Sequence, residues 1–509
     1  MRLPAPLSLW IDTTLAPDRS GAELPPAAEV VVIGAGIAGL TAACCLAESG
    51  LDVLVLEAGQ VAAGVSGNTT AKVTAQHGMR YARLLRNKGE AGAAEYAAAQ
   101  LEALEWIARG VESGGVDCSF QRVSSWIYST RPGDREAYVA EADACRRAGL
   151  RATQLTETPL PFPVAAAVRV EGQAQFHPRR WLLHLADRIE AAGGRIIEEI
   201  RATRVDGDTV ATTRGSVEAR EVVVATHFPI LDRAGFFARL EPVRDLVVSG
   251  PVDPARAPDG MFLCTSESRS LRTVPRDDGT TDLVVGGENY RVGTRSAVLE
   301  RHQALASWAQ RHFGLTSVTH RWSAHDLVTP DGMMYAGRYH PAADHLWVAT
   351  GFNLWGMTGG TAAGLLVADL VRGRADRERA ALFNPSRADV DQLPGLVKDN
   401  AVVAAHLVGD LTSAARRELS PEDLAPGQSR VGRVGTRLVA AHRDAEGVLH
   451  AVDARCTHLG CTVSFNDSEQ SWDCPCHGSR YGLDGSVLHG PAVEPLAPFD
   501  EAVGTGTHS

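Results

Sequence analysis

The chain has 509 residues, more than one hydrophobic core usually organises, so two or three domains are expected. Its 44% hydrophobic and 22% charged residues are ordinary for a globular protein, and the formal net charge of −11 argues against nucleic acid or an anionic membrane surface as a partner. The sequence shows neither a run of about twenty apolar residues nor a signal-peptide pattern, so we expect no membrane span and a cytoplasmic location.

The first recognisable element is a nucleotide-binding turn. Residues 29–33 have the pattern of a buried parallel strand, which runs into Gly34-Ala-Gly36-Ile-Ala-Gly39 and an Ala/Leu-rich helix. A second strand follows and ends at the acidic residue Glu57. Strand, glycine turn, helix and acidic residue together predict dinucleotide binding, with a pyrophosphate at the helix start and a ribose at Glu57.

Three further segments indicate which dinucleotide is bound. The loop 57–70, the strand 221–226 and the segment 346–358 resemble parts of the FAD-dependent amine oxidoreductases of the D-amino-acid oxidase type. The resemblance implies FAD, an α/β Rossmann-like FAD-binding domain and an antiparallel α+β substrate domain. It also implies flavin contacts at Ser66, Thr70, Ala225, Gly351, Trp355, Gly356, Met357 and Thr358.

A few polar residues on the substrate side are candidates for catalysis. His177 precedes a predicted helix, and Arg269 and Arg272 could clamp a carboxylate bidentately. A helix-entry role for the histidine and surface ion pairs for the arginines remain as alternatives. His77, which follows the flavin loop, is expected to pack near the flavin rather than to bond to it, and residues 322–331 are expected close to the flavin.

Two short runs near the C-terminus, C-T-H-L-G-C at 456–461 and C-P-C-H-G-S at 474–479, form a Rieske iron–sulfur signature. In a Rieske [2Fe-2S] cluster two Cys thiolates hold one iron and two His imidazoles hold the other. A zinc ribbon is the alternative, but neither run offers the C-x-x-C knuckle that such a site usually needs. The predicted ligands are Cys456, His458, Cys474 and His477.

The same region is similar to the Rieske proteins of cytochrome bc complexes. That resemblance implies a disulfide between Cys461 and Cys476, and hydrogen bonds from Ser479 and Tyr481 to cluster sulfurs. Residues 490–492 resemble the proline loop that covers the cluster. We expect the outer edges of both ligand imidazoles to be exposed, where an electron partner would approach.

The predicted organisation has four parts: a surface strap (1–28), an oxidoreductase domain (29–385), a linker with an amphipathic helix (386–417) and an all-β Rieske domain (418–509). Within the oxidoreductase domain, FAD-binding parts are expected at 29–80, 176–240 and 329–375, and substrate-side parts at 81–175 and 241–328.

These assignments predict an FAD-dependent dehydrogenase that oxidises a small organic substrate, preferably an amine or amino acid, at a C–N bond. Electrons would pass singly to its own Rieske cluster and on to an external acceptor whose identity the sequence does not reveal. Two alternatives stay open: a Rieske cluster that feeds a flavin-dependent reduction or oxygenation, and a non-enzymatic redox sensor. A Rieske oxygenase would also need an iron held by two His and a carboxylate, and no compact His-rich segment suggests one.

Overall fold

The structure is a computed structural model that describes residues 1–231, 233–276, 278–293, 297–387 and 417–499. The predicted linker and amphipathic helix lie almost entirely outside these residues. The chain forms two compact units. The first unit comprises Met1–His227, Arg244–Asn289 and Glu300–Ala388, and the second comprises Phe228–Val243, Tyr290–Leu299 and Asp389–Ser509.

The first unit contains a mainly parallel sheet with the strand order β16-β17-β10-β1-β2-β7, joined by the hairpin β8–β9. In its strand β1 the last four residues, Val30–Ile33, are apolar and buried, as expected of a parallel strand covered on both faces. In chain order the strands are β1 (Ala27–Ile33), β2 (Val53–Leu56), β7 (Arg195–Ile197), β8 (Ala202–Asp206), β9 (Thr209–Thr212), β10 (Gly215–Val224), β16 (Tyr335–Arg338) and β17 (Leu346–Thr350).

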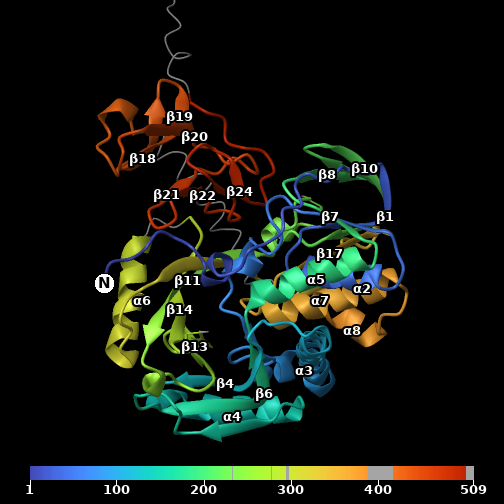
Figure 1. Cartoon of the computed structure of the whole chain (residues 1–509), viewed down its shortest axis with the longest axis vertical. Helices are drawn as coiled ribbons and strands as arrows, with labels where there is room; N and C mark the ends of the chain where they lie inside the picture. Colours follow the sequence, from blue (N-terminus) through green and yellow to red (C-terminus); the bar gives the residue numbers. More distant parts are fainter. Residues whose placement is uncertain (232, 277, 294–296, 388–416, 500–509) are drawn as a thin grey trace, which may run out of the picture. The chain divides into compact units, whose positions relative to one another are not determined.

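Helices pack against this sheet, and three of them lie side by side in Figure 1: α2 (Ile37–Ala47), α5 (Pro178–Ala191) and α7 (Gly356–Val371). Glycines allow the closest approach, because a Cβ atom on Gly364 of α7 would lie 2.6 Å from the carbonyl oxygen of Ala38 in α2. The remaining helices of the first unit are α1 (Leu9–Asp12), α3 (Tyr81–Gly114, interrupted at Gly89), α4 (Arg135–Arg147), α6 (Val298–Phe313) and α8 (Arg377–Leu382).

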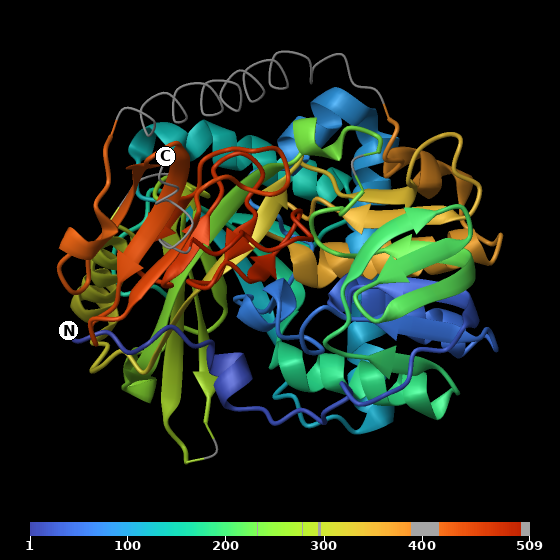
Figure 2. The same ribbon diagram turned by 90° about the horizontal axis from the view of Figure 1, so that it is seen from above.

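A second, mainly antiparallel sheet has the order β15-β11-β14-β13-β12-β4-β6-β3, with β5 paired to β6. Its strands β13 and β14 form the long hairpin drawn in yellow-green in Figure 2. The sheet joins both predicted substrate-side parts of the chain, and the predicted fold class is confirmed. Its strands are β3 (Lys72–Val73), β4 (Gln121–Ser129), β5 (Ala152–Leu155), β6 (Ala166–Gln175), β11 (Glu241–Val252), β12 (Met261–Cys264), β13 (Arg269–Pro275), β14 (Thr281–Arg291) and β15 (His320–Val328).

The N-terminal strap is not wholly on the surface, and the expectation is wrong for α1. Trp10 is fully buried, and its indole nitrogen donates to the carbonyl oxygen of Thr69 at 2.6 Å. The Ser8 hydroxyl donates to the carbonyl of Gly67 at 2.6 Å. An indole combines a large apolar area with one donor, so it is stable inside the protein once that donor has a partner. The strap therefore holds the predicted flavin loop.

The second unit contains two small antiparallel sheets, as a Rieske domain requires. One consists of β18 (Ser429–Val434), β19 (Arg437–Arg443) and β20 (Leu449–Asp453), and the other of β21 (Ser464–Asn466), β22 (Ser471–Asp473), β23 (Arg480–Tyr481) and β24 (Val487–His489). Their core includes Trp472 and Tyr481, together with the four cysteines of the two predicted cluster loops. Among the helices that the structure describes in either unit, none combines the length and apolar composition of a membrane span.

Candidate flavin site and iron–sulfur centre

The turn between β1 and α2 requires glycines, because a Cβ atom at these positions would clash with the backbone. A Cβ atom on Gly39 would lie 1.9 Å from the carbonyl oxygen of Gly34, and one on Gly34 would lie 2.5 Å from that of Ala225. Gly34 also has a φ of +106°, which favours glycine. These three predicted residues therefore meet where β10 ends, and the first turn of α2 can approach a pyrophosphate there.

Glu57 and Ser66 organise the start of α2. The Glu57 carboxylate accepts hydrogen bonds from the backbone N–H of Ala35 at 2.7 Å and of Gly59 at 2.8 Å. Burial raises the pKa of Glu57. Each carboxylate oxygen keeps another lone pair, so a ribose hydroxyl could still donate to it. The Ser66 hydroxyl accepts from the N–H of Ile37 at 3.0 Å. Glycine turn, helix start and buried acceptor fit the nucleotide part of FAD.

The flavin loop and the C-terminal flavin motif are tied together around His77. Thr358, in the first turn of α7, donates its hydroxyl to the carbonyl of Thr74 at 2.8 Å and lies 3.1 Å from Nε2 of His77. The Trp355 ring stacks on His77 with 4.8 Å between centroids, and the Tyr96 hydroxyl lies 2.6 Å from Nδ1. Burial lowers the pKa of His77 well below its usual value, which disfavours the charged imidazolium.

The other predicted motif residues surround this contact. Gly351 has a φ of +71°, and its carbonyl oxygen accepts a 2.6 Å hydrogen bond from the Asn353 amide. Gly356 begins α7, and the side chain of Met357 is buried in the core. Met357 could therefore reach a flavin only with its backbone. The hydroxyl of Thr70 accepts from Lys72 at 3.2 Å.

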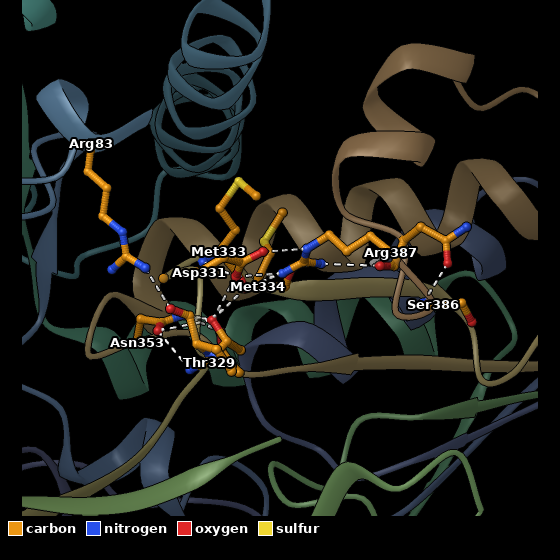
Figure 3. A network of polar contacts seen from close by, with 12 residues as sticks. Arg83, Thr329, Asp331, Met333, Met334, Asn353, Ser386 and Arg387 are labelled. Carbon is orange, nitrogen blue, oxygen red and sulfur yellow. Dashed lines mark hydrogen bonds and ion pairs between the residues drawn. The ribbon is translucent and has the colours of Figure 1, made fainter. Parts of the chain in front are cut away.

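The segment 322–331 is anchored to the same motif by a buried polar network (Figure 3). Arg387 makes two hydrogen bonds to Asp331, from Nε to Oδ2 at 2.6 Å and from Nη2 to Oδ1 at 2.9 Å. Asp331 also accepts from the N–H of Met333 at 3.0 Å. The Thr329 N–H donates to the side-chain oxygen of Asn353 at 2.9 Å. The network fixes the turn before the last strands of the FAD-binding sheet.

The structure favours structural roles for two of the three catalytic candidates. His177 caps α5 by accepting from the N–H of Arg180, and its Nε2 lies 3.0 Å from the Thr13 hydroxyl of the strap. Burial lowers the pKa of His177 to about 3. Arg269 forms ion pairs with Glu288 at 3.1 Å and Glu267 at 3.4 Å.

Arg272 is the third candidate and has a different environment. It lies three residues from Arg269 on β13, so the two side chains point to opposite faces and cannot clamp one carboxylate together. Arg272 is buried, donates to the backbone carbonyls of Ala71 at 2.6 Å and Phe176 at 3.1 Å, and lies over the Trp10 ring. Burial lowers the pKa of Arg272 to about 9.

Lys72 is a candidate that the sequence analysis missed. It is 8% exposed, and its ammonium group donates to the hydroxyls of Thr70 at 3.2 Å and Ser270 at 3.1 Å. Burial, and then the charge of Arg272, lower the pKa of Lys72 to about 7, and burial raises the pKa of nearby Asp245 to about 7. The available signal was a lysine between Ala71 and Val73, directly after the flavin loop. Two buried cations and one carboxyl group can bind an anionic group.

The pH dependence of stability tests this burial. A lysine with a lowered folded pKa binds fewer protons than in the unfolded chain, so its contribution to stability rises between about pH 7 and pH 10, by about 1.4 kcal/mol per pH unit. We expect the melting temperature of Lys72→Met, relative to wild type, to be highest near pH 7 and to decline as the pH rises. Lys88→Met, on α3, is the control. Parallel pH curves for Lys72→Met and wild type would contradict a buried Lys72.

In the second unit, the two predicted cluster loops face each other. We call residues 456–461 cluster loop 1 and residues 474–479 cluster loop 2. The rings of His458 and His477 lie 5.0 Å apart, nearly perpendicular. The expected disulfide between Cys461 and Cys476 is present and joins the loops. Each loop is a tight turn closed by its own backbone, which brings its Cys and His ligands to one side.

The thiol side of the centre has the predicted hydroxyl groups. The Tyr481 hydroxyl lies 3.1 Å from Sγ of Cys456. The contact with Cys474 lowers the pKa of Cys456 to about 6, whereas the contact with Cys456 and burial raise the pKa of Cys474 well above its usual value. The Ser479 hydroxyl accepts from the N–H of Ala492 at 3.1 Å and so holds the predicted proline loop. Two thiols and two facing imidazoles fit a Rieske [2Fe-2S] cluster.

The two imidazoles differ in exposure, which corrects one expectation. His458 is partly exposed, but His477 is only 2% exposed. The rings of Phe228 and Phe237 lie edge-on to His477, with centroids 6.2 Å and 6.0 Å away. Both phenylalanines belong to Phe228–Val243, a segment more than two hundred residues earlier in the chain.

Comparisons with known proteins agree with both sites. Residues 29–370 match the family model described as FAD dependent oxidoreductase, and residues 417–500 match the Rieske [2Fe-2S] domain. The chain is 34% identical over 506 residues to the Rieske 2Fe-2S iron-sulfur protein YhfW of Bacillus subtilis, covering 97% of this chain and 98% of that protein.

Two further matches cover the first unit. Gamma-glutamylputrescine oxidoreductase of Escherichia coli is 24% identical over 69% of this chain and 84% of its own length. The crystal structure of glycine oxidase from Geobacillus kaustophilus superposes with a TM-score of 0.60 at 21% identity, covering 72% of this chain and all of that one. The latter similarity concerns the fold.

Proposed function

Because the chain belongs to the family of FAD-dependent oxidoreductases and carries a C-terminal Rieske [2Fe-2S] domain, we propose that it oxidises a small amine or amino acid at a C–N bond and delivers the electrons singly, through its Rieske centre, to an external acceptor. The observation that carries the proposal is the presence of both sites on one chain. Bound FAD accepts two electrons together and can release them separately, and a Rieske centre carries one.

The substrate class is supported by the buried charges of the first unit. Lys72 lies within electrostatic reach of a second buried cation, Arg272, and of one buried carboxyl group, Asp245, directly after the predicted flavin loop. A substrate carboxylate would balance this excess of buried positive charge. One relative, gamma-glutamylputrescine oxidoreductase, carries a name that denotes an amine derivative. An amine that bears a carboxylate therefore suits the site better than a simple amine.

An anaerobic titration tests the proposal. Candidate amines, amino acids and hydroxy acids are added to the holoenzyme in the absence of oxygen. We expect the correct substrate to bleach the flavin absorbance first and the iron–sulfur bands second, with a Rieske EPR signal appearing in step. Oxidation of one C–N bond releases two electrons, so each substrate supports two one-electron reductions of an external acceptor. Flavin bleaching without reduction of the cluster would contradict this electron path.

Iron analysis separates the remaining alternatives. A Rieske cluster alone predicts about two irons per chain. About three would indicate an additional mononuclear iron and would favour an oxygenase, in which the cluster supplies electrons instead of receiving them. A holoenzyme with two irons whose flavin is reduced by no candidate substrate would favour a redox sensor.

A further inference from the structure

The second unit is composite. In addition to the Rieske sequence it contains Phe228–Val243 and Tyr290–Leu299, two segments that the family match assigns to the oxidoreductase part of the chain. The first of them begins three residues after Ala225, which closes the glycine turn of the predicted FAD site. The oxidoreductase sequence therefore contributes structure directly to the iron–sulfur unit.

Phe228–Val243 covers the imidazole of cluster loop 2. Phe228 and Phe237 approach His477 edge-on, at interplanar angles of 73° and 88°. Phe237 lies in a single turn of 3-10 helix, Phe236–Ala238. Two T-shaped aromatic contacts therefore meet at this ligand, whose side chain is 2% exposed.

Tyr290–Leu299 contacts the backbone of the same loop. Gly293 lies against Pro475, between the ligand Cys474 and the disulfide, so closely that a Cβ atom on Gly293 would be 2.4 Å from the proline Cα. The Gly293 carbonyl accepts from the Ser464 hydroxyl at 2.7 Å. The carboxylate of Asp467 accepts from the N–H of Val298 at 3.1 Å. Both segments thus converge on cluster loop 2.

Cluster loop 1 has a different environment. His458 is partly exposed, and the adjacent Leu459 is 45% exposed although its side chain is apolar. The two ligand histidines therefore differ: His477 is buried beside the oxidoreductase sequence, and His458 is partly exposed. A cluster that receives electrons internally and releases them externally needs two such sides.

We propose that cluster loop 2 is the internal side of the Rieske centre. Electrons from the flavoprotein reach the cluster at His477 through the packing of Phe228 and Phe237. They leave the cluster at His458 and pass to the external acceptor. The inference rests on the proposed function. Each C–N oxidation releases two electrons, and they pass through the cluster one after the other. The first enters at His477 and leaves at His458 before the second follows.

Hydrogen–deuterium exchange of the full-length holoprotein tests the packing without any substrate. We expect slower backbone exchange in residues 474–479 than in residues 456–461. Phe237→Ala should accelerate exchange in cluster loop 2 and leave cluster loop 1 unchanged, because it opens a cavity only beside His477. Leu459→Ala is the matched control, since it removes an apolar side chain from cluster loop 1. Equal acceleration of both loops by Phe237→Ala would overturn the assignment.

Single-turnover kinetics test the electron path. Phe228→Leu and Phe237→Leu keep apolar bulk but remove the aromatic edges. We expect flavin bleaching by substrate to keep its wild-type rate, the subsequent reduction of the cluster to slow severalfold, and direct reduction by dithionite to be unaffected. Val448→Ala, which shortens an exposed apolar side chain of the second unit outside both cluster loops, should leave all three rates unchanged.

The outcomes are distinguishable. If cluster reduction keeps its wild-type rate in both leucine variants, the assignment of His477 as the internal side is wrong, whereas the proposed function stands. If the wild-type cluster is never reduced by substrate, the proposed function fails, and the exchange experiment still reports on the packing. Should Phe237→Ala lose iron, the leucine variants, checked for two irons per chain and a wild-type EPR spectrum, decide the question.

Discussion

Arg387→Met is expected to lower the free energy of unfolding of the first unit by about 3–5 kcal/mol, because it leaves a buried carboxylate without its partner. The side chains of Arg387 and Asp331 are 7% and 5% exposed, and two hydrogen bonds join them. Methionine retains much of the apolar stem, so the loss of charge pairing dominates. Urea denaturation, followed by flavin fluorescence, measures the change.

The pH dependence of this pair has a definite sign. Burial raises the pKa of Asp331, but the hydrogen bonds and charge of Arg387 outweigh it and the pKa is lowered. A lowered carboxyl pKa stabilises the fold above the unfolded pKa, and this stability is lost as the pH falls through the folded pKa. In Arg387→Met the pKa of Asp331 should rise, so the variant should lose less stability than wild type on acidification.

A surface pair provides the control. Arg338 and Asp344 also form an ion pair, at 3.1 Å, but their side chains are 51% and 86% exposed. Exposed pairs contribute between about 0 and 1 kcal/mol, so Arg338→Met should have little effect. Similar losses for Arg387→Met and Arg338→Met would contradict a stabilising role for the buried network.

The sequence predicted those parts of the sites in which neighbouring residues fix the geometry. The glycine turn requires residues without Cβ atoms at Gly34 and Gly39, and these glycines belong to one short sequence motif. The cluster loops are similar, since tight turns and short Cys–His spacings carry the ligand pattern. The disulfide was also expected, but through a resemblance to other Rieske proteins rather than through spacing.

The parts that the sequence did not reveal depend on contacts between distant residues. Lys72 reaches Ser270 across 198 positions, and its burial follows from the pairing of strands that are far apart in the chain. Trp10 lies in the segment predicted to be a surface strap, because its hydrogen-bond partner in the flavin loop, Thr69, cannot be identified from the strap sequence alone. His477 was expected to be exposed, because Phe228 and Phe237 belong to the predicted oxidoreductase domain and their contact with His477 cannot be seen in the sequence. Hydrophobic periodicity describes one segment at a time and cannot identify such partners.

Arg387 shows the same limit at a domain boundary. The predicted linker begins at residue 386, in a segment rich in Arg, Asp and Pro, yet Arg387 lies in the first unit and is bound to Asp331. Composition reports average polarity, whereas a single buried ion pair depends on one partner 56 positions away. A polar segment can therefore contain a residue that a buried ion pair fixes to the folded domain.

Cys456→Ser is expected to abolish the cluster. Iron should fall from about two per chain towards zero, and the Rieske EPR signal should disappear, because a serine hydroxyl does not replace a soft thiolate as an iron–sulfur ligand. Iron analysis and EPR spectroscopy measure the loss.

The same variant tests where electrons leave the protein. If the Rieske centre is the exit, Cys456→Ser should still allow substrate to bleach the flavin, while reduction of the external acceptor stops. Cys45→Ser controls for the loss of a thiol, because Cys45 lies in α2, far from both cluster loops in the sequence, and burial raises its pKa. That control should keep iron, EPR signal and turnover. Undiminished turnover of Cys456→Ser with the external acceptor would show that electrons leave the flavin by another route, and both the proposed electron path and the assignment of His477 as the internal side would then be wrong.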